Sequence, residues 1–200
     1  MPLLLSKQIN PYSAYAVWHI TETEQQLSEK IEEVPRPSHP NRKSEWIVTR
    51  ILVKYLTEIF DLTYQGVANL ESGKPVLSGQ RAEISISHSF PMAAVLINLR
   101  KPCGIDLELP REKLQIVRSK FLNDSENAET YDLIDLCKFW TAKEVLFKVY
   151  GDKALSFKNH MLIEMDEDWK ATGLILKNSF EARYTIHFET LNKYLLAFSV

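Results

Sequence analysis

The stretch LCKFWTAKEVLFKVYG, residues 136–151, carries a clear helical pattern. Leu136, Trp140 and Phe147 recur at a spacing that places them on one face of a helix. The glycine that ends the stretch stands where helices often finish in a left-handed residue. We therefore predict a helix over about residues 132–150.

Segments typical of β-strands lie on both sides of this helix. Before it, the pattern predicts strands over residues 14–20, 84–89, 93–99 and 105–109; after it, over residues 161–165, 171–176, 182–188 and 194–200. The first half adds a charged helical segment, 22–33, and an amphipathic helix, 41–60, with Asn41 as its N-cap. The order predicts an α+β fold of two halves, residues 1–101 and 102–200.

Composition excludes several classes of protein. The net charge of the 200 residues is −2, so we expect no nucleic-acid partner. No apolar run has the roughly 20 residues of a membrane span, and the N-terminus lacks the features of a signal peptide. Two cysteines without metal-ligand spacing favour reduced thiols and a cytoplasmic location.

The segment GIDLE, residues 104–108, contains two carboxylates two positions apart. In a strand, Asp106 and Glu108 share one face, while Ile105 and Leu107 lie on the other. Carboxylates this close repel each other unless a cation lies between them, and Mg²⁺ favours such oxygen ligands. A solvated acidic face of an edge strand is the alternative.

Glu144 interrupts the apolar stripe of the predicted helix. It follows Trp140 by four residues and precedes Phe147 by three, so it lies at the edge of the buried face. A carboxylate there needs a partner. Lys148, four residues on, is within reach, so the alternative is an ordinary surface ion pair.

The segment ISISHSF, residues 84–90, ends a predicted strand in polar side chains. Ser87 and His88 lie next to a turn, where hydroxyl and imidazole groups can bind phosphate. The alternative is a capped strand end with a hydrogen-bonded histidine. Neighbouring serine and histidine residues of a strand point apart, so no catalytic triad is implied.

Four blocks in this order resemble the signatures of the 4′-phosphopantetheinyl transferases. They are GKP (73–75), SISHS (85–89), GIDLE (104–108) and FWTAKEVLFKVYG (139–151). The chain length is similar to that of the long, Sfp-like class rather than the shorter holo-acyl-carrier-protein synthases. The resemblance implies two similar α/β halves related by a pseudo-twofold, a site in the cleft between them, and a monomer.

The resemblance also implies an activity. Members move the 4′-phosphopantetheine arm of coenzyme A onto a serine of an apo acyl or peptidyl carrier protein, and release 3′,5′-adenosine diphosphate. By similarity, Asp106, Glu108 and Glu144 would bind one Mg²⁺, with Glu144 also accepting the serine proton. Lys148 would contact the pyrophosphate.

Other residues would hold coenzyme A or the carrier. By the same similarity, Ser87 and His88 would bind phosphate groups, with the 3′-phosphate assigned to His88, and Lys74 would lie near the pyrophosphate or adenine. Either Arg42 or Arg50 would add a contact to the 3′-phosphate. Basic residues after the GIDLE strand would face an acidic carrier: Arg111, Lys113, Arg118 and Lys120.

Two other functions are compatible with these features. One is a Mg²⁺-dependent hydrolase of coenzyme A, and the other is a non-catalytic module that binds coenzyme A or the carrier.

Overall fold

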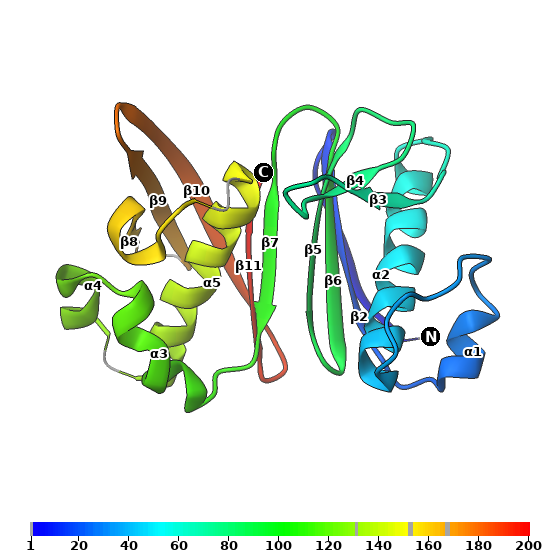
Figure 1. Cartoon of the computed structure of the whole chain (residues 1–200), viewed down its shortest axis with the longest axis horizontal. Helices are drawn as coiled ribbons and strands as arrows, with labels where there is room; N and C mark the ends of the chain where they lie inside the picture. The colour runs from blue at the N-terminus through cyan, green and yellow to red at the C-terminus, as the bar shows by residue number, and fades with distance from the viewer. Residues whose placement is uncertain (1, 131, 152–153, 167–168) are drawn as a thin grey trace. The chain divides into compact units, whose positions relative to one another are not determined.

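Two antiparallel sheets, each with a long helix on one face, make up the mixed α+β fold (Figure 1). The computed structural model describes residues 2–130, 132–151, 154–166 and 169–200. The chain divides into two compact units, Met1–Cys103 and Gly104–Val200, and each unit contains one of the sheets.

The sheet of the first unit has six strands in the spatial order β1-β2-β6-β5-β4-β3, and all neighbouring strands are antiparallel. The strands are β1 (Leu3–Asn10), β2 (Ser13–His19), β3 (Val67–Asn69), β4 (Pro75–Leu77), β5 (Glu83–Ser89) and β6 (Met92–Asn98). The helices are α1 (Glu24–Ser28) and α2 (Pro40–Ile59).

Helix α2 packs on this sheet because one of its faces is apolar. Val48, Leu52 and Leu56 recur along that face and are fully buried. They share a core with alternate residues of β2, β5 and β6, such as Ile84 of β5. Alternation along β5 therefore places Ile84, Ile86 and His88 toward α2 and the intervening serines on the other face.

The sheet of the second unit has five antiparallel strands in the order β7-β11-β10-β9-β8. The strands are β7 (Gly104–Glu108), β8 (Met161–Met165), β9 (Lys170–Lys177), β10 (Phe180–Leu191) and β11 (Tyr194–Ser199). The helices are α3 (Lys113–Phe121), α4 (Asp124–Ala128), α5 (Leu133–Tyr150) and α6 (Phe157–His160).

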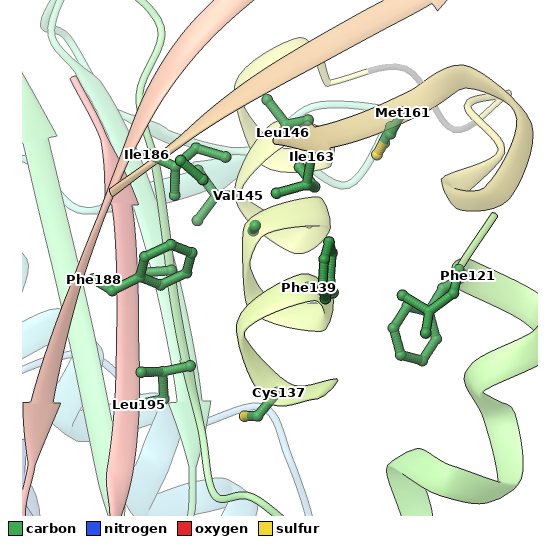
Figure 2. Packing of buried hydrophobic residues seen from close by; sticks show 14 of the residues in the cluster. Phe121, Cys137, Phe139, Val145, Leu146, Met161, Ile163, Ile186, Phe188 and Leu195 are labelled. Carbon is green, nitrogen blue, oxygen red and sulfur yellow. The ribbon is translucent and has the colours of Figure 1, made fainter. Parts of the chain in front are cut away.

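Helix α5 is the centre of the second core. Figure 2 shows α5 with Ile186 and Phe188 of the sheet on one side and Phe121 on the other. The N-cap of the helix is Asp132, whose side chain accepts hydrogen bonds from two backbone N–H groups. The C-cap is Gly151, in the left-handed region (φ 75°). Both ends confirm the predicted helix.

Gly104 allows α5 to lie unusually close to β7. A Cβ at this position would meet the backbone oxygen of Val145 at 2.5 Å and a methyl carbon of Val149 at 2.9 Å. The glycine of GIDLE is thus required by packing, and this close packing brings the turns of α5 that carry Glu144 and Lys148 near Asp106 of β7.

Most predicted strands are confirmed, but some strands were not predicted and two helix boundaries were wrong. Strands β1, β3 and β4 lie outside the predicted strand ranges, and the charged segment 22–33 forms only the short helix α1. The N-cap of α2 is His39, two residues before the expected Asn41, and Pro40 is in the first turn, where its missing N–H costs no helical hydrogen bond. Among the described residues, no helix is long and apolar enough to cross a membrane.

Candidate functional site

Strand β7 turns both of its carboxylates toward helix α5. Asp106 pairs with Ala197 and Glu108 with Leu195 in the register with β11, and these two partners belong to the core around α5. Residues directly opposite in a sheet share a face. The prediction that Asp106 and Glu108 share a face is therefore confirmed.

Lys148 of α5 reaches the buried member of this pair. Its Nζ donates to Oδ1 of Asp106 at 2.8 Å and to the backbone oxygen of Ile105 at 2.9 Å. Asp106 is only 6% exposed. The side chain of Lys148 thus crosses from α5 to β7, rather than forming the surface pair with Glu144 that was the alternative.

Glu144 lies half-buried on α5, and its environment opposes its charge. Burial, together with the neighbouring carboxylates of Asp106 and Glu108, raises its pKa from 4.5 to about 7, although Lys148 acts in the opposite direction. Three carboxylates therefore influence one another in this cluster, which we call the carboxylate cluster: Asp106, Glu108 and Glu144, with Lys148.

The carboxylate cluster is not arranged as a finished metal centre. Across the part of the chain that the structure describes, no three His, Cys, Asp or Glu side chains are gathered so as to hold a metal ion. Glu108 accepts a hydrogen bond from Nη2 of Arg111 at 2.6 Å, and Asp106 is paired with Lys148. The donors still fit Mg²⁺ chemically, because they are hard oxygen ligands whose mutual repulsion a cation would relieve.

Lys143, the neighbour of Glu144 in sequence, has a different role. It is fully buried, and its Nζ donates to Oε2 of Glu126 at 2.6 Å. The same ammonium contacts three backbone oxygens, those of Phe121 (2.7 Å), Phe157 (2.9 Å) and Met161 (3.1 Å). One helical step of 100° turns this side chain away from β7, so it belongs to the core and not to the site.

A second cluster lies in the first unit, where α2 meets the end of β5. Nη1 of Arg42 lies 3.1 Å from Nδ1 of His88. The carboxylate oxygen Oε2 of Glu45 contacts both groups, at 3.2 Å from Arg42 Nη1 and 3.3 Å from His88 Nδ1. We call these three residues the α2 cluster. The side chains of Arg42 and His88 are 61% and 35% exposed, but the Glu45 side chain only 5%.

Glu45 is ionised in this cluster. Burial alone would raise its pKa, but the hydrogen bond and charge of His88, the charge of Arg42 and a backbone hydrogen bond from Phe90 together lower it. The sequence analysis missed this residue. The signal was present, because Glu45 is in helical register with the buried residues Thr49, Leu52 and Leu56, as Glu144 is with its own stripe.

The structure does not bring every expected residue to these clusters. Arg50, two turns beyond Arg42, lies over the ring of Trp46 with its Cζ 4.1 Å from the centroid, and it donates to Thr49. Ser87 is buried and faces away from α2, opposite to His88.

Lys74 lies at the other end of β5 from the α2 cluster. Its Nζ pairs with Glu83 at 2.5 Å. Glu83 begins the strand, five positions before His88, which corresponds to about 16 Å along an extended strand. The Lys74 ammonium and His88 thus lie at opposite ends of β5.

A comparison with known protein families gives a match over the second unit of the chain. The model of a family described as the 4′-phosphopantetheinyl transferase superfamily matches residues 102–199. No curated protein matches the sequence. The similarity to the 4′-phosphopantetheinyl transferase superfamily thus spans the second unit of the chain, and it includes the whole carboxylate cluster.

Proposed function

We propose that this protein transfers the 4′-phosphopantetheine arm of coenzyme A to a serine of an apo acyl or peptidyl carrier protein. The observation that carries the proposal is the coincidence of the superfamily match with the carboxylate cluster of β7 and α5. The serine oxygen attacks the phosphorus atom next to the pantetheine, the P–O bond to the second phosphate breaks, and 3′,5′-adenosine diphosphate leaves with the bonding electrons.

The carboxylate cluster is suited to a magnesium-dependent form of this reaction. Asp106, Glu108 and Glu144 would hold the ion, which would neutralise charge on the pyrophosphate. Lys148, already directed at this face of β7, supplies a further positive charge there. Phosphoryl transfer needs mainly positioning and charge neutralisation, which these residues provide.

Glu144 is our candidate to accept the proton of the carrier serine. A general base works best when its pKa is near the working pH. In the metal-free protein, burial and the two neighbouring carboxylates raise the pKa of Glu144 to about 7, and a bound Mg²⁺ would lower it from there.

The α2 cluster is our candidate for the 3′-phosphate of coenzyme A. Arg42 and His88 are exposed cationic or protonatable groups within contact of each other. This arrangement favours Arg42 over Arg50, whose guanidinium stacks on Trp46.

A pocket beside Glu108 supports a carrier surface in the second unit. It has a volume of about 560 Å³ and is lined by Glu108, Leu109, Arg111, Lys113, Leu114, Val117, Lys120, Phe121, Trp140, Ser156 and Phe157. Its apolar floor and three basic side chains suit an acidic carrier. Arg111, Lys113 and Lys120 of this lining are exposed, so they would present the charged part of this surface.

Intact mass spectrometry tests the proposed function directly. An apo carrier protein is incubated with the purified chain, coenzyme A and Mg²⁺, with EDTA as control. A metal-dependent gain of one phosphopantetheine arm supports the transferase. Consumption of coenzyme A without modification of the carrier would favour a hydrolase, and binding without consumption a non-catalytic module.

The raised pKa of Glu144 predicts a pH-dependent stability of the metal-free protein. Below pH 4.5 the Glu144 carboxyl is protonated in both the folded and the unfolded protein. Between pH 4.5 and about 7 it loses its proton in the unfolded protein but keeps it in the folded one, so the free energy of unfolding falls as the pH rises. We expect the free energy of unfolding, relative to Glu144→Gln, to fall by about 3 kcal/mol across this range. Chemical denaturation in EDTA at several pH values measures it, and parallel curves for the two proteins would contradict it.

Replacing His88 is expected to change coenzyme A selectivity. In His88→Ala, coenzyme A should bind about tenfold more weakly relative to its 3′-dephospho form, because one charge-assisted hydrogen bond to the phosphate is lost. Calorimetric titration with both ligands measures this ratio. If the variant and the parent give the same ratio, His88 does not contact the 3′-phosphate.

A further inference from the structure

The α2 cluster contains a negative charge that a phosphate site does not need. The carboxylate of Glu45 lies 3.2 Å from Arg42 and 3.3 Å from His88, and its side chain is 5% exposed. Arg42 and His88, which would bind the phosphate, therefore already contact a carboxylate of the protein itself. Glu45 is buried beside them on α2, so its charge is only weakly screened by solvent.

The balance of charge in the cluster is small. With Arg42 and His88 both charged, the ionised Glu45 leaves a net charge of at most +1. A phosphate monoester carries about −1.5 to −2 near neutral pH. The carboxylate of Glu45, which contacts the two side chains that would bind the phosphate, would repel that phosphate. The site is partly buried, so solvent does not fully screen this repulsion.

We propose that Glu45 sets the nucleotide specificity of this protein, making it accept the 3′-hydroxyl of dephospho-coenzyme A nearly as well as the 3′-phosphate of coenzyme A. The inference rests on the proposed function, because it assigns the α2 cluster to the 3′ position of the nucleotide. Glu45 acts through Arg42 and His88 and is a specificity-determining residue rather than a catalytic one.

Two pairs of ligands test this specificity. The dissociation constants of 3′,5′-adenosine diphosphate and 5′-AMP are measured by calorimetry, and kcat/KM is measured for coenzyme A and dephospho-coenzyme A. We expect the parent protein to favour the 3′-phosphorylated ligand by less than about tenfold. Removing one unit charge at this distance, in Glu45→Gln, should raise that preference by about tenfold.

The matched control is Glu58→Gln, which removes the same charge from an exposed position near the other end of α2. It should leave the preference unchanged. A parent preference above about a hundredfold would overturn the inference without any variant, as would an equal change in both variants, no change in Glu45→Gln, or no binding of either nucleotide. A shift in the nucleotide preference without any carrier modification would refute the transferase proposal and leave the role of Glu45 supported.

Discussion

Replacing Asp106 with asparagine is expected to lower kcat/KM for carrier modification by about 10³-fold while the fold is retained. Asparagine keeps an oxygen that can accept from Lys148, which now donates to Oδ1 of Asp106 at 2.8 Å. What it removes is one negative charge from a cluster in which three carboxylates face one another. In the proposed reaction this charge helps to neutralise the pyrophosphate, so its loss should destabilise the transition state directly.

A binding measurement separates this role from a general loss of activity. Titration with Mg²⁺ alone should raise the unfolding temperature of the parent protein and leave that of Asp106→Asn nearly unchanged. The matched control is Glu181→Gln, which neutralises an exposed carboxylate of β10 in the same unit. If Asp106→Asn kept both its turnover and its response to Mg²⁺, the metal assignment would be wrong.

The faces on which the three carboxylates lie could be predicted from sequence because strand alternation and helical periodicity are local, whereas the gathering of these residues was implied only by the family resemblance. Alternation in β7 puts Asp106 and Glu108 on one face, and helical periodicity puts Glu144 at the edge of a buried stripe. The contact between Lys148 and Asp106 spans 42 positions of sequence. It depends on the close approach that Gly104 permits, which no periodicity reveals.

The α2 cluster shows where local patterns are insufficient. Arg42 and Arg50 lie on the same basic helix, and only the packing of α2 on β5 distinguishes the arginine that meets His88 from the one that stacks on Trp46. Glu45 was missed because it stands among basic residues, where a carboxylate resembles an ordinary surface partner. Its burial comes from the sheet beneath it, which is a tertiary effect.

Lys143 demonstrates the same limit with a larger energetic consequence. In sequence it flanks Glu144 and resembles a second cation of the site, but it is fully buried together with Glu126, which is 1% exposed. Glu126 also accepts from the backbone N–H groups of Asn123 at 2.9 Å and Ile163 at 3.0 Å. This buried pair thus connects α5 to the ends of α3, α4, α6 and β8.

Lys143→Met is expected to lower the free energy of unfolding by about 3–5 kcal/mol, because it leaves the carboxylate of Glu126 buried without its cation. Methionine has nearly the same volume, so the loss comes from charge and hydrogen bonding rather than from a cavity. Urea denaturation at neutral pH measures the change, with Lys120→Met, at an exposed position on α3, expected to stay within about 0.5 kcal/mol of the parent. Adding Glu126→Gln should restore part of the loss, because the uncompensated charge is then removed while an oxygen acceptor remains.

At temperatures where Lys143→Met stays folded, carrier modification should continue at close to the parent rate. A Lys143→Met variant that was stable but inactive would instead place Lys143 in the site.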